Sequence, residues 1–422
     1  MARLPRNPLR LPEAIPAPLR RAAVVLLGVA FIAASAAAVL LFDTTKTDLD
    51  AFFWPSAEIA AHGHPLLVYT FHSGLYPNAN GPVSLLPLSL VALVANALGW
   101  GGSMHPRDAL TVGAFAVFSL LLAREAVLAV EAGRGQGVRR LPVMAVFLLA
   151  PSLWVALIGF GHIEQPIELW LVLLGVRLLG RGATLRAGIC IGLAVMTRSI
   201  AAVCLIPLLA ALLSDRRARS AAALAGTTAL TAALVIAPFW LADRSDVLFS
   251  LVTYRGALPI VGGSLWVALP EGAVSGFVQH WDSVLFAGAA LVLNVAALAW
   301  RPRGGWAPPR VYALLAVAAA CVPLLAKTSW PYYLLDPYVF AAIWWLGRPG
   351  RVLSWRLAVP LLLAVEGIVL AAVEPTLPLA RTPGAVDGIL ASAGMALAIA
   401  LILAGWLRLP PAPRRPPAGA GA

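Results

Sequence analysis

The chain has 422 residues, of which 60% are hydrophobic and only 12% are charged, and its mean hydropathy is +0.86. Because soluble domains carry about 25% charged residues, this composition excludes an ordinary soluble protein. The formal net charge of +12 would suggest nucleic acid in a soluble chain, but here the arginines lie in short segments between apolar runs. That pattern marks cytoplasmic loops, so we expect an all-α, polytopic helical protein of the cell (plasma) membrane, with membrane lipids as neighbours and no nucleic-acid partner.

Apolar runs of about the length that crosses the hydrocarbon core recur from Ala22 to Leu407. They lie near Ala22–Phe42, Pro82–Trp100, Ala109–Val130, Leu141–Ile158, Pro166–Leu179, Ala187–Leu213, Ser220–Leu241, Ser283–Trp300, Val311–Leu325, Tyr332–Leu346, Trp355–Val373 and Gly388–Leu407. The run at 187–213 indicates two short helices that meet at residues 197–199. About thirteen candidate spans would leave the basic tail outside, whereas its arginines favour the cytoplasm. One segment is therefore re-entrant or joined to its neighbour, and we expect about twelve transmembrane helices.

The arginines also indicate where the two ends of the chain lie. Residues 1–21 are basic and precede a run that is too long for a signal peptide, so we expect an uncleaved cytoplasmic N-terminus. Residues 22–407 are expected to form a single transmembrane domain with external loops at 43–81 and 242–282, each bearing short interfacial helices. Residues 408–422 form a low-complexity tail that we expect to be disordered and cytoplasmic.

The loop at 43–81 holds an unusual share of the titratable side chains. These are Asp48, Asp50, Glu58, His62, His64 and His72. A loop beside a bilayer that gathers such groups is a candidate site of binding or proton transfer; the alternative is a solvated connector whose aromatic residues rest among the headgroups. Asp48 or Asp50 could act as a general base, or could cap a helix that begins at Ala51. His62 and His64 could bind a metal with either aspartate, but the signal is weak and we predict no metal site.

Two further polar groups interrupt apolar sequence. The segment GHIEQ at residues 161–165 contains His162 and Glu164, where a buried carboxylate is usually functional or paired. Glu164 could equally stabilise the N-terminus of the next helix. Arg198 lies in the middle of an apolar stretch and must meet an anion or water. Its planar guanidinium suits a phosphate, and the alternative is a structural ion pair with Glu164 or Asp48.

The loop at 242–282 and the segment KTSWPYY at 327–333 supply the remaining candidates for substrate binding. These are Arg255, His280, Lys327 and Trp330. Lys327 could be a second phosphate contact, with Arg255 as a helper, or an ordinary interfacial lysine beside aromatic residues. The sequence contains no glycine-rich nucleotide motif and no HExxH motif, so soluble nucleotide binding and zinc hydrolysis have no support.

The order of these motifs resembles the GT-C superfamily of membrane glycosyltransferases. It is most similar to glycosyltransferase family 87, the polyprenol-phosphate-mannose-dependent mannosyltransferases and their uncharacterised relatives. TDLDAF, Ala57, Gly63 and Tyr76-Pro77 stand where that family has its first external loop and the entry into the next span. GHIEQ is similar to the family's GQxN or GHPEE element, and AGICIGLAVMTRS is similar to its AGxxxGLAxxTK/R segment. SWPYY resembles its SWxHY element, without the histidine.

The resemblance implies a GT-C-like fold with the active site on the extracytoplasmic side. It implies inverting transfer of a sugar, mannose or another hexose or pentose, from a polyprenyl-phosphate donor to a cell-envelope glycolipid or glycan acceptor, with no further cofactor. Asp48, the first aspartate of TDLDAF, would be the general base, with Asp50 as the second candidate. Together with the residue-level reasoning above, the candidate substrate-binding residues are Tyr76, His162, Glu164, Arg198, Arg255, His280, Lys327 and Trp330.

Two other classes of protein are compatible with the sequence. One is a polytopic transporter or lipid flippase that binds an anionic headgroup with Arg198 and the loop carboxylates. The other is a catalytically silent scaffold for cell-envelope assembly. Transporters usually carry charge at the bilayer midplane on facing repeats, whereas this chain shows no internal repeat and concentrates charge in two external loops. The pattern therefore favours an enzyme.

Overall fold

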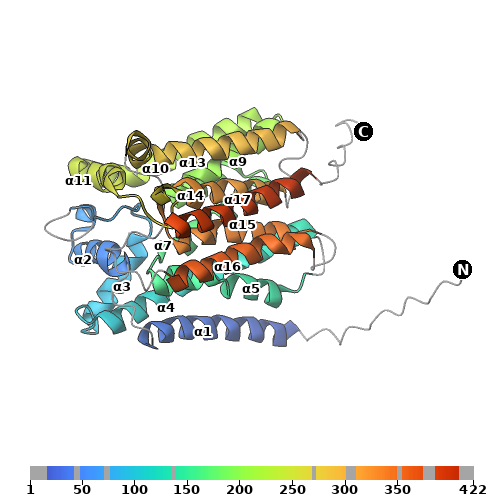
Figure 1. Ribbon diagram of the computed structural model, residues 1–422. Helices are drawn as coiled ribbons and strands as arrows, with labels where there is room; N and C mark the ends of the chain where they lie inside the picture. Colours follow the sequence, from blue (N-terminus) through green and yellow to red (C-terminus); the bar gives the residue numbers. More distant parts are fainter. Residues whose placement is uncertain are drawn as a thin grey trace, which may run out of the picture.

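The computed structural model describes residues 17–41, 48–70, 77–134, 138–268, 272–300, 310–348, 354–373 and 385–407. Nearly all of them lie in helices, so the predicted all-α class is confirmed. The long helices lie side by side, and the short segments α2 and α11 gather at one end of the bundle, on the left of Figure 1. The only strands in the described ranges are two residues long each.

Short 3-10 and π-type segments are labelled η. The first half of the chain contains α1 (Ala17–Leu41), η1 (Leu49–Phe53), α2 (Trp54–Ala61), η2 (Pro65–Leu67), α3 (Leu85–Ala97), α4 (Met104–Arg134), α5 (Arg140–Leu148), α6 (Pro151–Trp154), η3 (Val155–Gly159), α7 (Glu164–Gly180), α8 (Thr184–Val195), η4 (Ser199–Cys204) and α9 (Leu205–Ser214).

The second half begins with the long helix α10. It contains α10 (Ala218–Ala242), α11 (Arg244–Leu248), η5 (Phe249–Thr253), α12 (Tyr254–Ala257), β1 (Val261–Gly262), η6 (Leu265–Ala268), α13 (Ala273–Trp300), α14 (Arg310–Leu325), β2 (Thr328–Ser329), η7 (Pro331–Leu334), α15 (Leu335–Leu346), η8 (Trp355–Leu357), α16 (Ala358–Val373) and α17 (Ala385–Leu407).

Within the described ranges five helices are long and apolar enough to cross a membrane: Ala22–Leu41, Met104–Arg134, Ala218–Ala242, Val274–Trp300 and Ile389–Leu407. A sixth span results if the pair Arg140–Leu148 and Pro151–Gly159, which is bent by 51°, crosses as one. These helices are compatible with a membrane protein. The other predicted runs also form helices, but shorter ones, so the expectation of about twelve transmembrane helices stays a prediction.

The predicted break in the run at 187–213 is confirmed. Helix α8 ends at Val195 and η4 begins at Ser199, so Arg198 lies in the gap between them with an extended backbone. Both predicted loops contain short helices, as expected. The second loop is shorter than predicted, however, because α13 already begins at Ala273, and His280 therefore lies within a helix rather than in a loop.

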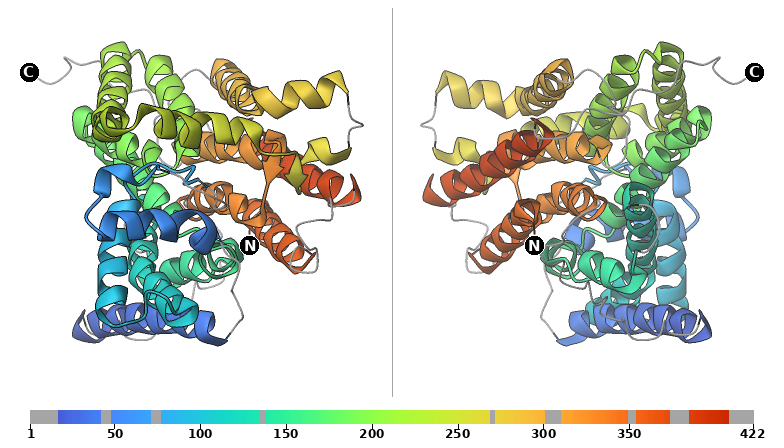
Figure 2. Two further views of the ribbon diagram at one scale, coloured as in Figure 1. Left: turned by 90° about the vertical axis from the view of Figure 1, so that its left-hand side faces the viewer. Right: turned by 90° about the vertical axis from the view of Figure 1, so that its right-hand side faces the viewer.

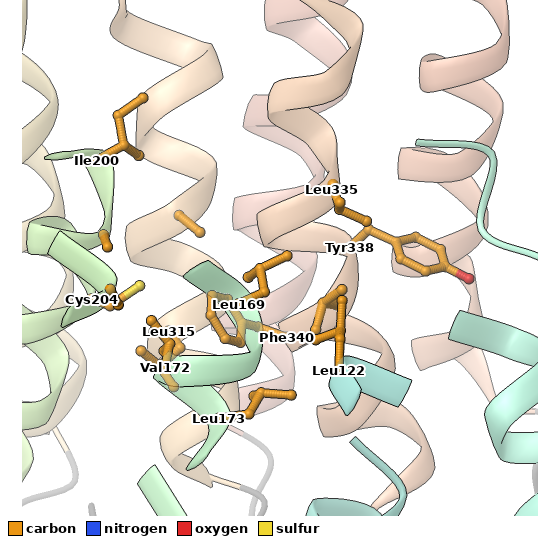
Figure 3. Packing of buried hydrophobic residues seen from close by; sticks show 14 of the residues in the cluster. Leu122, Leu169, Val172, Leu173, Ile200, Cys204, Leu315, Leu335, Tyr338 and Phe340 are labelled. Carbon is orange, nitrogen blue, oxygen red and sulfur yellow. The ribbon is translucent and has the colours of Figure 1, made fainter. Parts of the chain in front are cut away.

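Helix α14 forms the centre of the bundle. Nearly every residue from its start to Pro323 is buried, which fits a helix that is apolar on all sides. Helices α13, α15 and α17 pack against it. Leu169 of α7, Leu315 of α14 and Phe340 of α15 come together in this core (Figure 3) and are at most 1% exposed. A rigid core of this kind fixes the ends of α7 and α15, where the polar residues of the candidate site lie.

Helices α8 and α10 approach closely because α8 carries glycine at the contact. A Cβ atom on Gly192 would lie 2.6 Å from the Thr231 Cβ atom and 2.8 Å from the Thr228 carbonyl oxygen. Contacts this short force a neighbour to move, and the Thr228 carbonyl belongs to the backbone of α10. The close packing of these two helices therefore depends on the absence of a side chain at position 192.

We expect Gly192→Ala to destabilise the protein by about 1–3 kcal/mol, the usual cost of overpacking a core. The measurement is the midpoint of unfolding of the purified protein in detergent. Gly226→Ala on α10 is the matched control, since a Cβ there meets nothing within 4 Å. Equal midpoints for the two variants would contradict the close α8–α10 contact.

Candidate functional site

Four segments that are far apart in the sequence meet at one end of the bundle. Asp48 precedes η1, His162 precedes α7, Arg198 lies between α8 and η4, and Asp336 is the second residue of α15. In the left view of Figure 2, which faces this end, α2 and its flanking turns cross in front of the longer helices. One cluster of polar side chains is thus formed by residues in or next to four motifs, TDLDAF, GHIEQ, TRS and SWPYY.

His162 joins the first two motifs. Its Nε2 atom lies 2.7 Å from Asp48 Oδ2 and its Nδ1 atom lies 2.5 Å from Glu164 Oε1. The ring stacks on Tyr332 at a centroid distance of 3.7 Å and meets the edge of Phe53. Contacts on both nitrogens and with two aromatic rings hold the imidazole in one orientation.

The backbone around His162 explains how the turn is built. Gly161 has φ = +69°, a left-handed conformation that favours glycine. The His162 N–H donates to the Ala156 carbonyl at 2.7 Å, and the Asp48 N–H donates to the Phe160 carbonyl at 2.8 Å. These bonds tie the segment before η1 to the end of η3, so Asp48 is aligned with His162 by the backbone as well as by the side chain.

His162 is an imidazolium in this arrangement. Ionised carboxylates only accept hydrogen bonds, so both ring nitrogens must donate, one to Asp48 and one to Glu164. Burial alone would lower the pKa of His162, but the Glu164 and Asp48 carboxylates outweigh it and raise the pKa to about 9. The ring therefore stays charged at neutral pH and balances one of its two carboxylates.

The two candidate bases differ in their surroundings. The Asp48 side chain is 32% exposed, and its Oδ2 atom is the one bonded to His162. Asp50 instead forms an ion pair with Arg107, and the side chains of both are at most 13% exposed. Arg107 also contacts Asp108 at 2.9 Å and lies over the Trp54 ring. Asp48 is thus the more accessible of the two carboxylates, while Asp50 anchors η1 to α4.

The predicted capping role of these aspartates is wrong. Asp48 occupies the position before η1 but its side chain makes no capping hydrogen bond, and Asp50 lies inside η1. Both carboxylates meet a cationic side chain instead. A charged partner stabilises a carboxylate more strongly than one backbone N–H does, which accounts for the difference.

Arg198 is buried and forms ion pairs, although not with the partners that the sequence suggested. Its Nη1 atom lies 3.2 Å from Glu168 Oε2 and 3.2 Å from Asp336 Oδ2, and its guanidinium packs over Tyr333. The expected structural partners, Glu164 and Asp48, are taken by His162. The charge of Arg198 is thus already balanced by two carboxylates, and its contact with a donor phosphate stays a prediction.

Gln165 links the Arg198 cluster to the SWPYY segment. Its Nε2 atom donates to Asp336 Oδ1 at 2.6 Å and to the Tyr332 carbonyl at 2.9 Å. Three buried polar atoms in this region have no hydrogen-bond partner in the described part of the chain: Glu164 Oε2, Gln165 Oε1 and Arg198 Nη2. They include donor and acceptor atoms, which is the mixture that a water molecule or a hydroxyl-rich ligand satisfies.

Lys327 is buried and serves a structural role. Its Nζ atom donates to the Gly256 carbonyl at 2.7 Å and to the Gln279 carbonyl at 2.5 Å, while its N–H donates to Asp282 Oδ2. It stands beside the parallel pairing of Val261 with Thr328 and Gly262 with Ser329. The lysine ties the second loop to the start of the SWPYY segment, and these contacts leave its proposed phosphate contact a prediction.

The remaining predicted residues lie in different surroundings. Trp330 packs against Phe160 at 6.0 Å, next to the His162 cluster. His280 is exposed, and its Nδ1 atom contacts the Gly276 carbonyl within α13. Tyr76 lies outside the described residues, as does the side chain of Arg255, whose backbone belongs to α12. Only Trp330 of these four is seen beside the cluster.

The sequence does not reveal two sets of charged contacts in this region. Arg107 and Asp108 belong to GGSMHPRD, a short link between two apolar runs. The one feature of the sequence that could have indicated this contact is the adjacent pair of opposite charges, Arg107 and Asp108. Asp336 and Glu168 each follow a recognised motif by one helical turn, but the sequence alone does not show that they converge on Arg198.

No group of three or more His, Cys, Asp or Glu side chains that could hold a metal ion occurs within the described ranges. His62, a weak metal candidate, is exposed and contacts the Glu58 carbonyl at 2.7 Å. In comparisons with known proteins, no protein-family model and no curated protein matches this chain.

We expect the stabilising contribution of His162 to depend on pH. Because its folded pKa of about 9 exceeds the ordinary value of 6.5, the contribution is complete below about pH 6.5 and is lost as the pH rises through 9. The measurement is the difference in unfolding temperature between wild type and His162→Gln from pH 6 to pH 10. A difference that stays constant over this range would show that His162 is not an imidazolium.

Proposed function

We propose that the protein is a membrane glycosyltransferase with Asp48 as its general base. It moves a sugar, mannose or another hexose or pentose, from a polyprenyl-phosphate donor to a cell-envelope glycolipid or glycan acceptor. The observation that carries the proposal is the Asp48–His162–Glu164 arrangement, in which a partly exposed carboxylate is held by a buried imidazolium. The residues involved belong to the motifs that resemble family 87.

The proposed reaction is a single inverting displacement. Asp48 Oδ1, the oxygen that is not bonded to His162, accepts the proton of the acceptor hydroxyl. The hydroxyl oxygen forms a bond to the anomeric carbon of the sugar, on the face opposite the phosphate. The bond between that carbon and the phosphate oxygen breaks, and its electron pair leaves with the polyprenyl phosphate.

His162 and Glu164 act as positioning residues. The imidazolium fixes one oxygen of Asp48, so that the other oxygen points consistently toward the acceptor. Glu164 is fully buried and keeps the imidazole charged and oriented. A base held in one orientation loses less freedom in the transition state, which favours catalysis. Arg198 and its two carboxylates support the neighbouring Tyr332 and Tyr333 rings.

We further propose that the bundle is a GT-C-like domain with about twelve transmembrane helices. Shorter apolar helices, such as Leu85–Ala97, Thr184–Val195 and Arg310–Leu325, would cross together with the five long ones. The N-terminus and the C-terminal tail would lie in the cytoplasm, and Asp48 on the extracytoplasmic side. The supporting observation is that the short segments η1, α2 and η2 gather at the Asp48 end, as interfacial helices would.

We expect Asp48→Asn to lower the transfer rate by about 10²–10⁴, the usual worth of general-base catalysis, while the protein remains folded. The substitution preserves the shape of the side chain and removes only the basic oxygen. The measurement is transfer of labelled sugar from a polyprenyl-phosphate donor in membranes that contain each variant. Donor affinity should change far less than the rate.

Asp50→Asn is the matched control, because it makes the same chemical change two residues away. It breaks the ion pair with Arg107 and should destabilise the fold, by an amount near the 3–5 kcal/mol typical of a buried pair that loses one partner. Folded Asp50→Asn protein should retain transfer. If Asp50→Asn abolishes transfer while Asp48→Asn stays active, the base is Asp50; if both stay active, this loop is not the catalytic centre.

A further inference from the structure

A group of arginines lies at the end of the bundle opposite Asp48. Arg107, beside Asp50, is near the start of α4, and Arg134 is its last residue, about 40 Å away along a straight helix. Likewise Asp336 is near the start of α15, whereas Arg348 follows its end. Arg134 is therefore separated from Arg107 by about the thickness of a bilayer, whereas Arg348 lies about 18 Å along the helix direction from Asp336.

Two arginines at this far end, Arg310 and Arg356, pack on tryptophan rings. The Arg356 guanidinium lies 5.4 Å from the Trp344 ring and 5.5 Å from the Trp355 ring, and Arg310 lies 5.9 Å from Trp406. Burial, together with nearby Arg356 and Arg310, lowers the pKa of Arg348 to about 10. The basic cluster, defined here as Arg310, Arg348 and Arg356, thus brings like charges together in partly buried surroundings.

Three buried polar atoms here have no hydrogen-bond partner among the described residues. They are Arg348 Nη1, Arg356 Nε and Trp344 Nε1. All three are donors, whereas the corresponding atoms near Asp48 include acceptors. Buried donors normally find an acceptor, and three of them together beside like charges require a group that is rich in acceptor oxygens and negatively charged.

Described residues pack closely around the tryptophan rings and beside Arg348. A Cβ atom on Gly405 of α17 would lie 2.6 Å from both the Trp344 and the Trp355 rings, so these rings are closely covered on that side. On the other side Gly133 approaches the Gly347 carbonyl, and Arg134 Nε donates to the Arg348 carbonyl at 3.1 Å. The tryptophans and the backbone hold the guanidinium groups in place.

We propose that the basic cluster, with Trp344, binds the phosphate group of an anionic ligand. The phosphate offers several acceptor oxygens to Arg348, Arg356 and the indole N–H, and its charge relieves the repulsion between the arginines. The phosphate belongs either to a lipid headgroup or to a free phosphate compound. This site is separate from the proposed transfer reaction and does not depend on it.

The test is native mass spectrometry of the delipidated full-length protein with phosphatidylglycerol and with diacylglycerol of the same chains. These two lipids differ by the phosphate-linked headgroup. We expect wild type to retain phosphatidylglycerol in preference to diacylglycerol, and the double variant Arg348→Gln/Arg356→Gln to bind phosphatidylglycerol about tenfold less tightly or worse. Arg244→Gln is the matched control. Arg244, in α11, also lies over a tryptophan ring, that of Trp240, but outside the basic cluster. This variant should bind phosphatidylglycerol as wild type does.

Competition with inorganic phosphate distinguishes the two sources of the ligand. Displacement of the lipid by phosphate alone assigns the site to any phosphate compound, and resistance to displacement assigns it to the lipid. Equal binding of phosphatidylglycerol by wild type and the double variant would overturn the proposal, as would equal loss in Arg244→Gln. If the double variant does not fold, the same two lipids are compared on Arg356→Lys and on wild type. Wild-type protein that binds phosphatidylglycerol no better than diacylglycerol would overturn the proposal.

Discussion

The structure depends on one interaction above all, the imidazolium of His162 between the carboxylates of Asp48 and Glu164. It joins a segment next to α1 to the start of α7, more than a hundred residues later in the sequence. A charge of this kind is tolerated among apolar helices only when opposite charges and hydrogen bonds compensate its loss of water. The same requirement explains Arg198, whose two carboxylates come from α7 and α15.

Charges inside the bundle are therefore arranged in paired groups at the Asp48 end. Asp50 meets Arg107, Asp48 and Glu164 meet His162, and Glu168 and Asp336 meet Arg198. Within these groups only Asp48 keeps a substantially exposed carboxylate, while the other carboxylates are buried and hold the helices together. At the opposite end Arg310 and Arg356 lie on tryptophan rings, and Arg348 and Arg356 each have a buried donor atom with no acceptor among the described residues.

Much of the fold could be predicted from the sequence, because apolar runs and the break before Ser199 follow from local composition. The motifs TDLDAF, GHIEQ and SWPYY also indicated which segments carry the polar site. Their pairing could not be predicted, since it depends on how helices far apart in sequence pack. Arg107 looked like a loop residue, and the choice of Glu168 and Asp336 as partners of Arg198 follows from the tertiary contact of α7 with the SWPYY segment.

The central claim is that Asp48 is the base of a sugar transfer that inverts the anomeric carbon. The most direct measurement is the stereochemistry of the product formed by purified wild-type protein in liposomes from a polyprenyl-phosphate sugar and a glycolipid acceptor. The proposed single displacement predicts transfer with the opposite anomeric configuration to that of the donor. Retention of configuration, or movement of the lipid across the bilayer with no transfer at all, would contradict it.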